Sequence, residues 1–142
     1  MRVEQVHVVT EEHVAAFARL LPKLSPDARQ PSQADLAEVL AAAGTSLLIA
    51  RDDVGRVVGT LTLVLYPTPN KRLSLIEDVV VDAAARGQGI GAALVKEALG
   101  RARAWGAAQT DLLSHDRRAA AIRLYLRLGF RRYETNVFRF TY

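Results

Sequence analysis

The segment RGQGIG, residues 86–91, restricts what this chain can fold into and bind more than any other part of its sequence. An apolar stretch before it predicts a strand, and an amphipathic stretch after it predicts a helix. The first turn of a helix leaves backbone N–H groups without intrahelical acceptors at the positive end of the helix dipole. Because glycine permits a positive φ and a close approach of backbone to ligand, the segment is typical of a phosphate-binding turn. A tight connection that needs glycine only for steric reasons explains the same residues.

The spacing of these glycines disfavours two common nucleotide-binding folds. A dinucleotide-binding fold places GxGxxG at its first strand-to-helix turn, whereas GxGxG here lies past the midpoint of the 142 residues. A Walker loop has Lys followed by Ser or Thr after its last glycine, and Ala92 and Ala93 stand there instead. We therefore expect the turn to hold the phosphates of a nucleotide-bearing cofactor in another fold.

Hydrophobic periodicity and turn residues predict the element order β-α-α-β-β-β-α-β-α-β-β. Strands are expected at residues 2–9, 45–51, 56–66, 73–82 and 110–113, with two short ones near 130–134 and 136–142. Helices are expected between Thr10 and Pro22, between Ser32 and Gly44, from the glycine turn to about Trp105, and between Asp116 and Gly129. Only the connections into residues 110–113 and into the strand after Gly129 are expected to be parallel crossovers. This order predicts the α/β (α+β) class: one domain over residues 1–142, with about four helices flanking a mixed, mostly antiparallel seven-stranded sheet.

Composition excludes several classes of site. The chain has no cysteine, which excludes a disulfide framework, a thiolate metal site and a cysteine nucleophile. His7 and His13 have no partner at metal-ligand spacing, so we expect no metal. No apolar run approaches the roughly 20 residues that cross a bilayer, and the N-terminus has no signal-peptide core. A cytoplasmic protein without a membrane partner is the simplest interpretation.

Charge is unevenly distributed along the chain. Residues 1–85 contain eight Lys/Arg and eleven Asp/Glu, a net −3, whereas residues 86–142 contain eleven and four, a net +7. The basic part begins at the glycine turn, which suits an anionic ligand there, although solvated helix faces explain many single arginines. A nucleic-acid binder would also be basic, but no recognition element accompanies the charge. We therefore expect no nucleic-acid partner.

Two longer stretches resemble the GNAT superfamily of acyl-coenzyme A-dependent N-acetyltransferases. IEDVVVDAAARGQGIGAALV, residues 76–95, is similar to the family's cofactor strand and its Arg/Gln-x-x-Gly-x-Gly/Ala turn, with Arg86, Gly89 and Gly91 at the diagnostic positions. SHDRRAAAIRLYLRLGF, residues 114–130, resembles the family's later helix with its Leu-Tyr and Gly-Phe ending. The resemblance covers essentially the whole chain through the order of elements. It implies a single GNAT-type domain that uses acetyl-CoA as co-substrate and no metal.

The resemblance also implies a set of cofactor-binding positions. The main chain of the strand before the turn would pair with the pantetheine arm, and the amides of the turn would hold the pyrophosphate. Arg118 stands where many relatives have asparagine, and it could reach a cofactor phosphate or simply be solvated. The implied positions are Val79, Val80, Val81, Arg86, Gly87, Gln88, Gly89, Ile90, Gly91, Ala92 and Arg118.

Two residues are candidates for proton transfer. Tyr125 matches the family's tyrosine near the cofactor sulfur, and a phenol with a pKa of about 10 can protonate a departing thiolate; a place in the helix core explains it too. Glu77 is the candidate base, because period two puts it on the same strand face as Val79 and Val81 while Asp78 points the other way. Binding a substrate ammonium or pairing with an arginine is the alternative role for Glu77.

These features predict an N-acetyltransferase that moves an acetyl group from acetyl-CoA to a primary amine by direct attack in a ternary complex. A non-catalytic acyl-CoA-binding module is the alternative. The acidic excess before residue 86 lies in segments that border the acceptor site in this family, and it favours a cationic acceptor, either a small-molecule amine or a protein amine. The oligomeric state stays open, with a homodimer among the options.

Overall fold

Capping and turn residues divide the chain into the elements that the computed structural model shows for residues 1–142. The strands are β1 (Arg2–Gln5), β2 (Thr45–Arg51), β3 (Val57–Pro67), β4 (Arg72–Val81) and β5 (Thr110–Asp111). The α-helices are α1 (Glu11–Leu20), α2 (Gln33–Ala41), α3 (Ile90–Trp105) and α4 (Ala119–Arg127). Two short 3₁₀ helices are η1 (Leu21–Lys23) and η2 (Ala83–Ala85).

Most helix boundaries follow the predicted signals. At the start of α2, the Ser32 hydroxyl accepts a hydrogen bond from the Asp35 N–H (3.1 Å), and the Asp35 carboxylate accepts one from the Ser32 N–H (2.8 Å). This reciprocal pair satisfies donors that a helix start leaves open. Helix α4 ends before Gly129 (φ 96°), and the Phe130 N–H returns to the Tyr125 carbonyl at 3.0 Å. Its start differs from the prediction, because the N-cap is Arg118 rather than Asp116.

The strands form one mixed sheet in the order β1-β2-β3-β4-β5. Strands β1 to β4 pair antiparallel with their neighbours, and β5 runs parallel to β4. Helix α3 therefore connects β4 to β5 as the predicted parallel crossover. The mixed, mostly antiparallel character of the sheet is confirmed.

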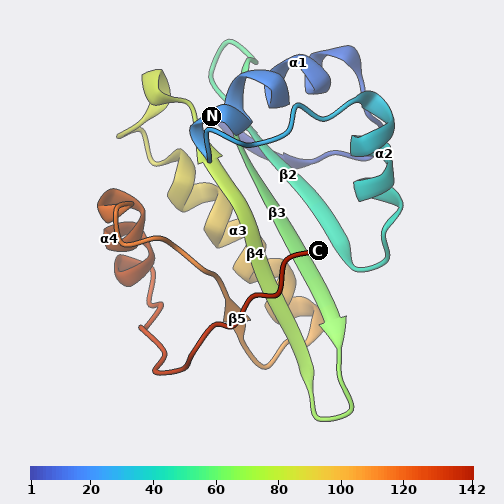
Figure 1. The fold of residues 1–142 in the computed structure, drawn as a ribbon. Helices are drawn as coiled ribbons and strands as arrows, with labels where there is room; N and C mark the ends of the chain where they lie inside the picture. Colours follow the sequence, from blue (N-terminus) through green and yellow to red (C-terminus); the bar gives the residue numbers. More distant parts are fainter.

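The prediction of seven strands is wrong, because the sheet has five. Residues 130–142 contain no strand, β1 ends at Gln5, and β5 has two residues. Figure 1 draws the final residues as an irregular trace. A strand forms only where a neighbouring edge pairs with it, and β5 is bonded to β4 only through Ser74–Thr110 and Leu75–Asp111. Because β5 is so short, it offers almost no free edge with which residues 130–142 could pair.

Two apolar cores lie on the two faces of the sheet. One packs α3 and α4 against it and includes Ile76, Leu94 and Tyr125. The other packs α1 and α2 against the opposite face and includes Phe17 and Leu47. Figure 1 shows α1 and α2 on one side of the strands and α3 on the other. The sheet is thus the middle of three layers, with apolar burial on both faces as the main stabilising contribution.

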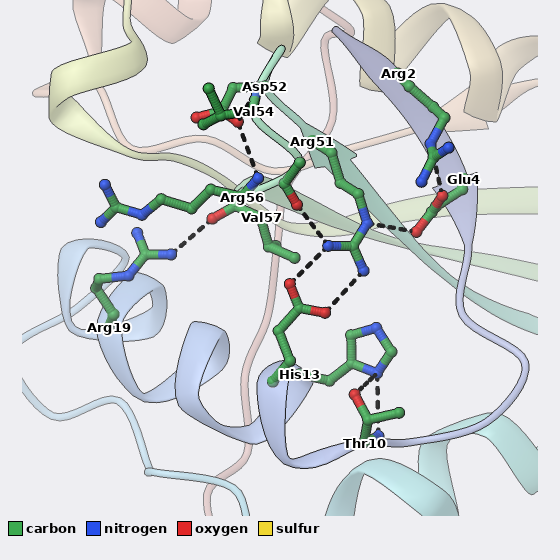
Figure 2. Close-up of polar contacts among 12 residues, drawn as sticks. Arg2, Glu4, Thr10, His13, Arg19, Arg51, Asp52, Val54, Arg56 and Val57 are labelled. Atoms are coloured by element: carbon green, nitrogen blue, oxygen red, sulfur yellow. Dashed lines mark hydrogen bonds and ion pairs between the residues drawn. The ribbon is translucent and has the colours of Figure 1, made fainter.

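A network of charged side chains holds α1 against β1 and β2 (Figure 2). The Arg51 guanidinium donates to Glu4, to Glu12 and to the Gly55 carbonyl, each at 2.7 Å. These hydrogen bonds hold the pKa of Glu4 and of Glu12 below its usual range. His13 Nδ1 accepts the Thr10 N–H at 3.1 Å, so this histidine belongs to the cap of α1. None of the helices combines the length and apolarity needed to cross a membrane.

Candidate functional site

The glycine turn has the geometry of an open anion-binding site. Gly87 and Gly89 both have a φ of 77°, and Gly89 is the N-cap of α3. The backbone N–H groups of residues 87–92 donate to no acceptor of the protein. Successive donors are therefore available at the positive end of a long helix. A β-carbon on either glycine would meet nothing within 4 Å, and Arg86 and Gln88 beside them are exposed.

Gly91 serves packing in addition to its place in the turn. A β-carbon at Gly91 would lie 3.0 Å from Cδ2 of Leu124, so α4 reaches the start of α3 because this side chain is absent. Its neighbour Ile90 is 2% exposed and belongs to the core beneath α3. Ile90 and Ala92 thus present only their backbone amides as candidate ligand groups.

Strand β4 loses its β5 neighbour before it reaches the predicted cofactor stretch. β5 pairs with Ser74 and Leu75 only, while Val80 and Val81 pair with β3 on their other side. The β5 side of residues 79–81 is therefore not covered by a strand. Arg118 reaches this stretch, where its Nη2 donates to the Val79 carbonyl at 3.1 Å. The structure thus gives Arg118 a main-chain partner that neither predicted role included.

An irregularity in β4 overturns the predicted orientation of Glu77. Thr62 of β3 pairs with Glu77 and Thr60 pairs with Val80, so β4 has one extra residue between the two pairs. Asp78, the one non-glycine residue with a positive φ (52°), lies in this bulge. The bulge interrupts period two, which places Glu77 on the face covered by α1 and α2. Val79 and Val81 pack against the opposite core.

Glu77 has the electrostatics of a candidate base. Partial burial, followed by repulsion from the Asp78 carboxylate, raises the pKa of Glu77 although its side chain reaches solvent. Opposite Glu77 on β3 is Thr62, which lines a cavity under α1 and α2. Glu77 therefore lies on the same face of the sheet as this cavity, although it is not one of the residues that line it.

Tyr125 is 6% exposed and lies in the core between α4 and the sheet. Its ring meets that of Phe130 edge-on, with centroids 5.8 Å apart. Burial raises the pKa of the Tyr125 phenol, and the nearby charge of Arg118 opposes this shift. The position of Tyr125 fits a core residue, and it also fits a proton donor, because α4 approaches the open edge of β4.

A cavity of about 670 Å³ opens beside the bulge, under α1, η1 and α2. Asp78 and Thr62 line its sheet side, and neither was among the site residues predicted from the sequence. A signal for Asp78 was available: aspartate is depleted in strands and enriched among left-handed residues. Two adjacent acids inside an apolar strand therefore indicate a bulge.

The connection between β5 and α4 carries further polar groups. The Ser114 hydroxyl is buried and has no hydrogen-bond partner, so one polar group stays available between β5 and α4. His115 Nδ1 accepts the Arg117 N–H at 3.1 Å, which makes this histidine part of the loop turn. No group of three or more His, Cys, Asp or Glu side chains is arranged to hold a metal.

Known proteins resemble this chain over nearly all of its length. Glucosamine 6-phosphate N-acetyltransferase of Trypanosoma brucei brucei is 29% identical over 136 residues, which are 92% of this chain and 90% of that protein. The crystal structure of a Trypanosoma brucei acetyltransferase is 28% identical with a TM-score of 0.78, covering 99% of this chain and 100% of that one. Ribosomal-protein-alanine N-acetyltransferase from Brucella melitensis biovar Abortus 2308 shares the fold at 22% identity and a TM-score of 0.75, over 99% and 100% of the two chains.

The sequence model of the Acetyltransferase (GNAT) family matches residues 7–130. This range includes the glycine turn, the β4 bulge and Tyr125, so the likeness extends through the candidate site. Enzymes of the family use acetyl-CoA as co-substrate. Because the match spans most of the chain, this protein belongs to the GNAT acetyltransferase family.

Proposed function

We propose that this acetyltransferase moves an acetyl group from acetyl-CoA to a primary amine by direct attack in a ternary complex. One observation carries the proposal: a single strand-turn-helix segment contains both candidate binding regions. Asp78 of this segment lines the cavity, and the open strand edge of residues 79–81 and the unpartnered amides of residues 87–92 follow it directly. Two binding regions that meet on one strand suit two substrates held together, and proximity supplies much of the catalysis. All these groups lie within residues 1–142, which we take to act as one domain.

The residues of β4 and the turn fit acetyl-CoA, which supplies an acetyl thioester when bound. The unpartnered amides of residues 87–92 would hold the pyrophosphate, with Arg86 as a charge-assisted donor beside them. The main chain of residues 79–81 would pair with the pantetheine arm. Arg118 then has to share or release the Val79 carbonyl that it contacts at 3.1 Å. Once released, its guanidinium is available to a cofactor phosphate.

Glu77 and Tyr125 are proposed to move the two protons of the reaction. As the amine nitrogen bonds to the acetyl carbon and the carbon–sulfur bond breaks, a Glu77 carboxylate oxygen accepts the proton that leaves nitrogen. The Tyr125 phenol gives its proton to the departing sulfur. A raised pKa suits both roles, because it makes Glu77 a stronger base and keeps Tyr125 protonated at neutral pH.

The cofactor assignment is tested by Gly89→Glu. The new side chain adds a negative charge at the turn and strains a position with a φ of 77°, so we expect acetyl-CoA affinity to fall by about tenfold or more. Gly100→Glu is the matched control, since Gly100 lies exposed in α3 with open space around its β-carbon position. Calorimetric titration with acetyl-CoA measures both. Equal affinity in the two variants would remove the turn from the cofactor site.

The enzymatic assignment is tested by Tyr125→Phe, followed as free-thiol release from acetyl-CoA with a panel of amines. Loss of the proton donor should lower kcat by about a hundredfold while acetyl-CoA affinity stays close to that of the parent protein. A variant with full kcat would show that Tyr125 is only a core residue. Tight acetyl-CoA binding by the parent protein, without turnover on any amine, would identify a non-catalytic acyl-CoA-binding module instead.

A further inference from the structure

The cavity beside the β4 bulge has an apolar floor and a charged rim. Its volume is about 670 Å³, which lies within the usual range for small-molecule sites. Phe17, Leu36 and Leu47 form buried parts of its wall. Asp27, in the loop before α2, and Glu38, on α2, also line the cavity and are exposed. The cavity therefore offers a ligand both buried apolar surface and exposed carboxylates.

The sheet end of the same cavity carries another carboxylate. Asp78 lines the cavity, and Thr62 beside it is the cross-strand partner of Glu77. Asp78 therefore lies on the β4 side of the cavity with the proposed base next to it in the strand, whereas Asp27 and Glu38 belong to the segment that covers the cavity. The cavity thus has carboxylates on its strand side and on its helical side, together with an apolar wall.

The lining has almost no positive charge to offset these acids. Arg29 is its one cation, and its Nη2 pairs with Asp35 at 2.8 Å. Asp35 also accepts the Ser32 N–H, so this pair is internally neutral and belongs to the cap of α2. Asp27, Glu38 and Asp78 form no ion pair with any residue of the protein. The cavity thus presents uncompensated negative charge to a ligand.

We propose that the acceptor is a diamine, in which an apolar chain or ring separates the reacting amine from a second ammonium group. The inference rests on the proposed acetyl transfer and names the acceptor class for that site. The reacting amine lies at Glu77 and Asp78, the apolar body packs on the Phe17 and Leu47 wall, and the second ammonium lies between Asp27 and Glu38. Like charges near the rim disfavour an acceptor that carries a carboxylate or phosphate at its far end.

The proposed acceptor of this chain differs from glucosamine 6-phosphate, the acceptor in the name of its trypanosome relative. A sugar phosphate brings a dianionic group that needs free cationic or N–H donors. The one arginine of the cavity is already paired, and the unpartnered amides of residues 87–92 are assigned to the cofactor. Glucosamine 6-phosphate is therefore expected to be a poor acceptor here.

The test compares acceptors that differ only at the far end. Linear α,ω-diamines of increasing length are assayed beside the monoamines and the ω-amino acids of equal length, with glucosamine 6-phosphate included. Thiol release from acetyl-CoA gives kcat/KM for each. Because an exposed ion pair contributes modestly, we expect the best diamine to exceed its monoamine by about fivefold and its amino acid by more.

Two variants locate the preference on the rim. Asp27→Asn and Glu38→Gln should each lower the ratio of diamine to monoamine kcat/KM toward one. Glu134→Gln is the matched control, since Glu134 is exposed near the C-terminus and does not line the cavity. It should leave the ratio as in the parent protein.

Direct binding separates the acceptor class from the reaction. Diamine and ω-amino acid are titrated calorimetrically into the parent protein and Glu38→Gln, with coenzyme A present. Turnover without diamine preference overturns the acceptor class and leaves acetyl transfer standing. Preferential diamine binding that Glu38→Gln weakens, without turnover, supports the acceptor class and overturns the proposed function. Neither binding nor turnover overturns both.

Discussion

Asp78 adopts a φ of 52° at the point where β4 changes register against β3. A left-handed conformation costs a residue with a β-carbon about 1–2 kcal/mol, although aspartate tolerates it better than most. Because of this one residue, Glu77 faces the cavity side while Val79 and Val81 keep their contacts with the other core. Backbone strain that persists in a fold often belongs to a functional arrangement, and here it separates the side chain proposed for the amine from the main chain proposed for the cofactor.

Glu77→Gln distinguishes the two roles that the sequence left open. If Glu77 accepts the amine proton, kcat should fall by about a hundredfold, and the acidic limb of the pH–rate profile that follows Glu77 should disappear. If Glu77 only binds the ammonium, KM rises and kcat is kept. Steady-state kinetics from pH 5 to about pH 9 decides between them, with Glu134→Gln as the exposed control.

The same variant should change stability in a pH-dependent way. The pKa of Glu77 in the folded protein lies above its ordinary value of 4.5, so the ionised form is disfavoured on folding. Above the folded pKa the charge therefore lowers stability, and below 4.5 both states are protonated and the contribution vanishes. Glu77→Gln should raise Tm slightly at neutral pH and leave it unchanged near pH 4. A lower Tm at neutral pH would contradict the raised pKa.

At the scale of elements, the helices could be predicted because their signals are local. The start of one helix after Ser32 and the end of another before Gly129 are read from neighbouring residues, and the structure confirms both boundaries. The strands depend on distant partners. The alternation of Phe138, Phe140 and Tyr142 predicts a strand, yet these side chains are exposed and no neighbouring edge pairs with them. The bulge at Asp78 is a change of register against β3, and the period-two pattern of β4 does not predict it. The adjacent acids Glu77 and Asp78 are its one sequence signal.

The contact between α3 and β3 depends on Gly59. A β-carbon there would lie 3.1 Å from Ile90 Cγ2 and from Leu94 Cδ1, and 3.2 Å from the Val80 carbonyl oxygen. The backbone oxygen cannot move without shifting β4, so Gly59→Ala should destabilise the protein by about 1–3 kcal/mol.

Gly100→Ala is the matched control, because this glycine lies inside α3 with open space around it. The same added methyl group should stabilise the helix there by about 0.5–1 kcal/mol. Urea unfolding of the two variants measures both changes. Equal effects of the same sign would show that the close approach of α3 to β3 is not under steric constraint.

At the scale of the whole molecule, Asp82 joins the helices over the proposed acceptor cavity to the strand that leads to the proposed cofactor turn. This carboxylate follows β4 and has a side chain that is 8% exposed. It contacts Arg19 of α1, Lys23 of η1 at 2.8 Å and Arg56 before β3 at 3.6 Å. Arg19 also donates to the Val57 carbonyl at 2.6 Å, as Figure 2 shows. One buried anion therefore links the helices over the cavity to the strand end that leads into the glycine turn.

Removing the charge of Asp82 should lower the free energy of unfolding of the protein. Asp82→Asn leaves Arg19 and Lys23 without their anion, and breaking a buried ion pair costs about 3–5 kcal/mol. Because these cations are 31% and 29% exposed, solvent screens part of this cost, and we expect about 1–3 kcal/mol. Urea unfolding at neutral pH measures the loss. Glu97→Gln, which removes one partner of an exposed pair on α3, should change stability little.

The pH dependence of this loss identifies its cause. The pKa of Asp82 lies below its ordinary value of 3.8, mainly because Lys23 donates a hydrogen bond to its carboxylate. The hydrogen bond from the Ala84 N–H and the charges of Lys23 and Arg19 lower this pKa further. The ionised form is therefore favoured by folding, so its stabilisation is complete above 3.8 and is lost as pH falls through the lower, folded pKa. The difference between parent protein and Asp82→Asn should be constant from neutral pH to about pH 5 and shrink in stronger acid. A difference that persists unchanged in acid would mean that Asp82 acts through shape and hydrogen bonding, and that the two sides of the sheet are not held together by its charge.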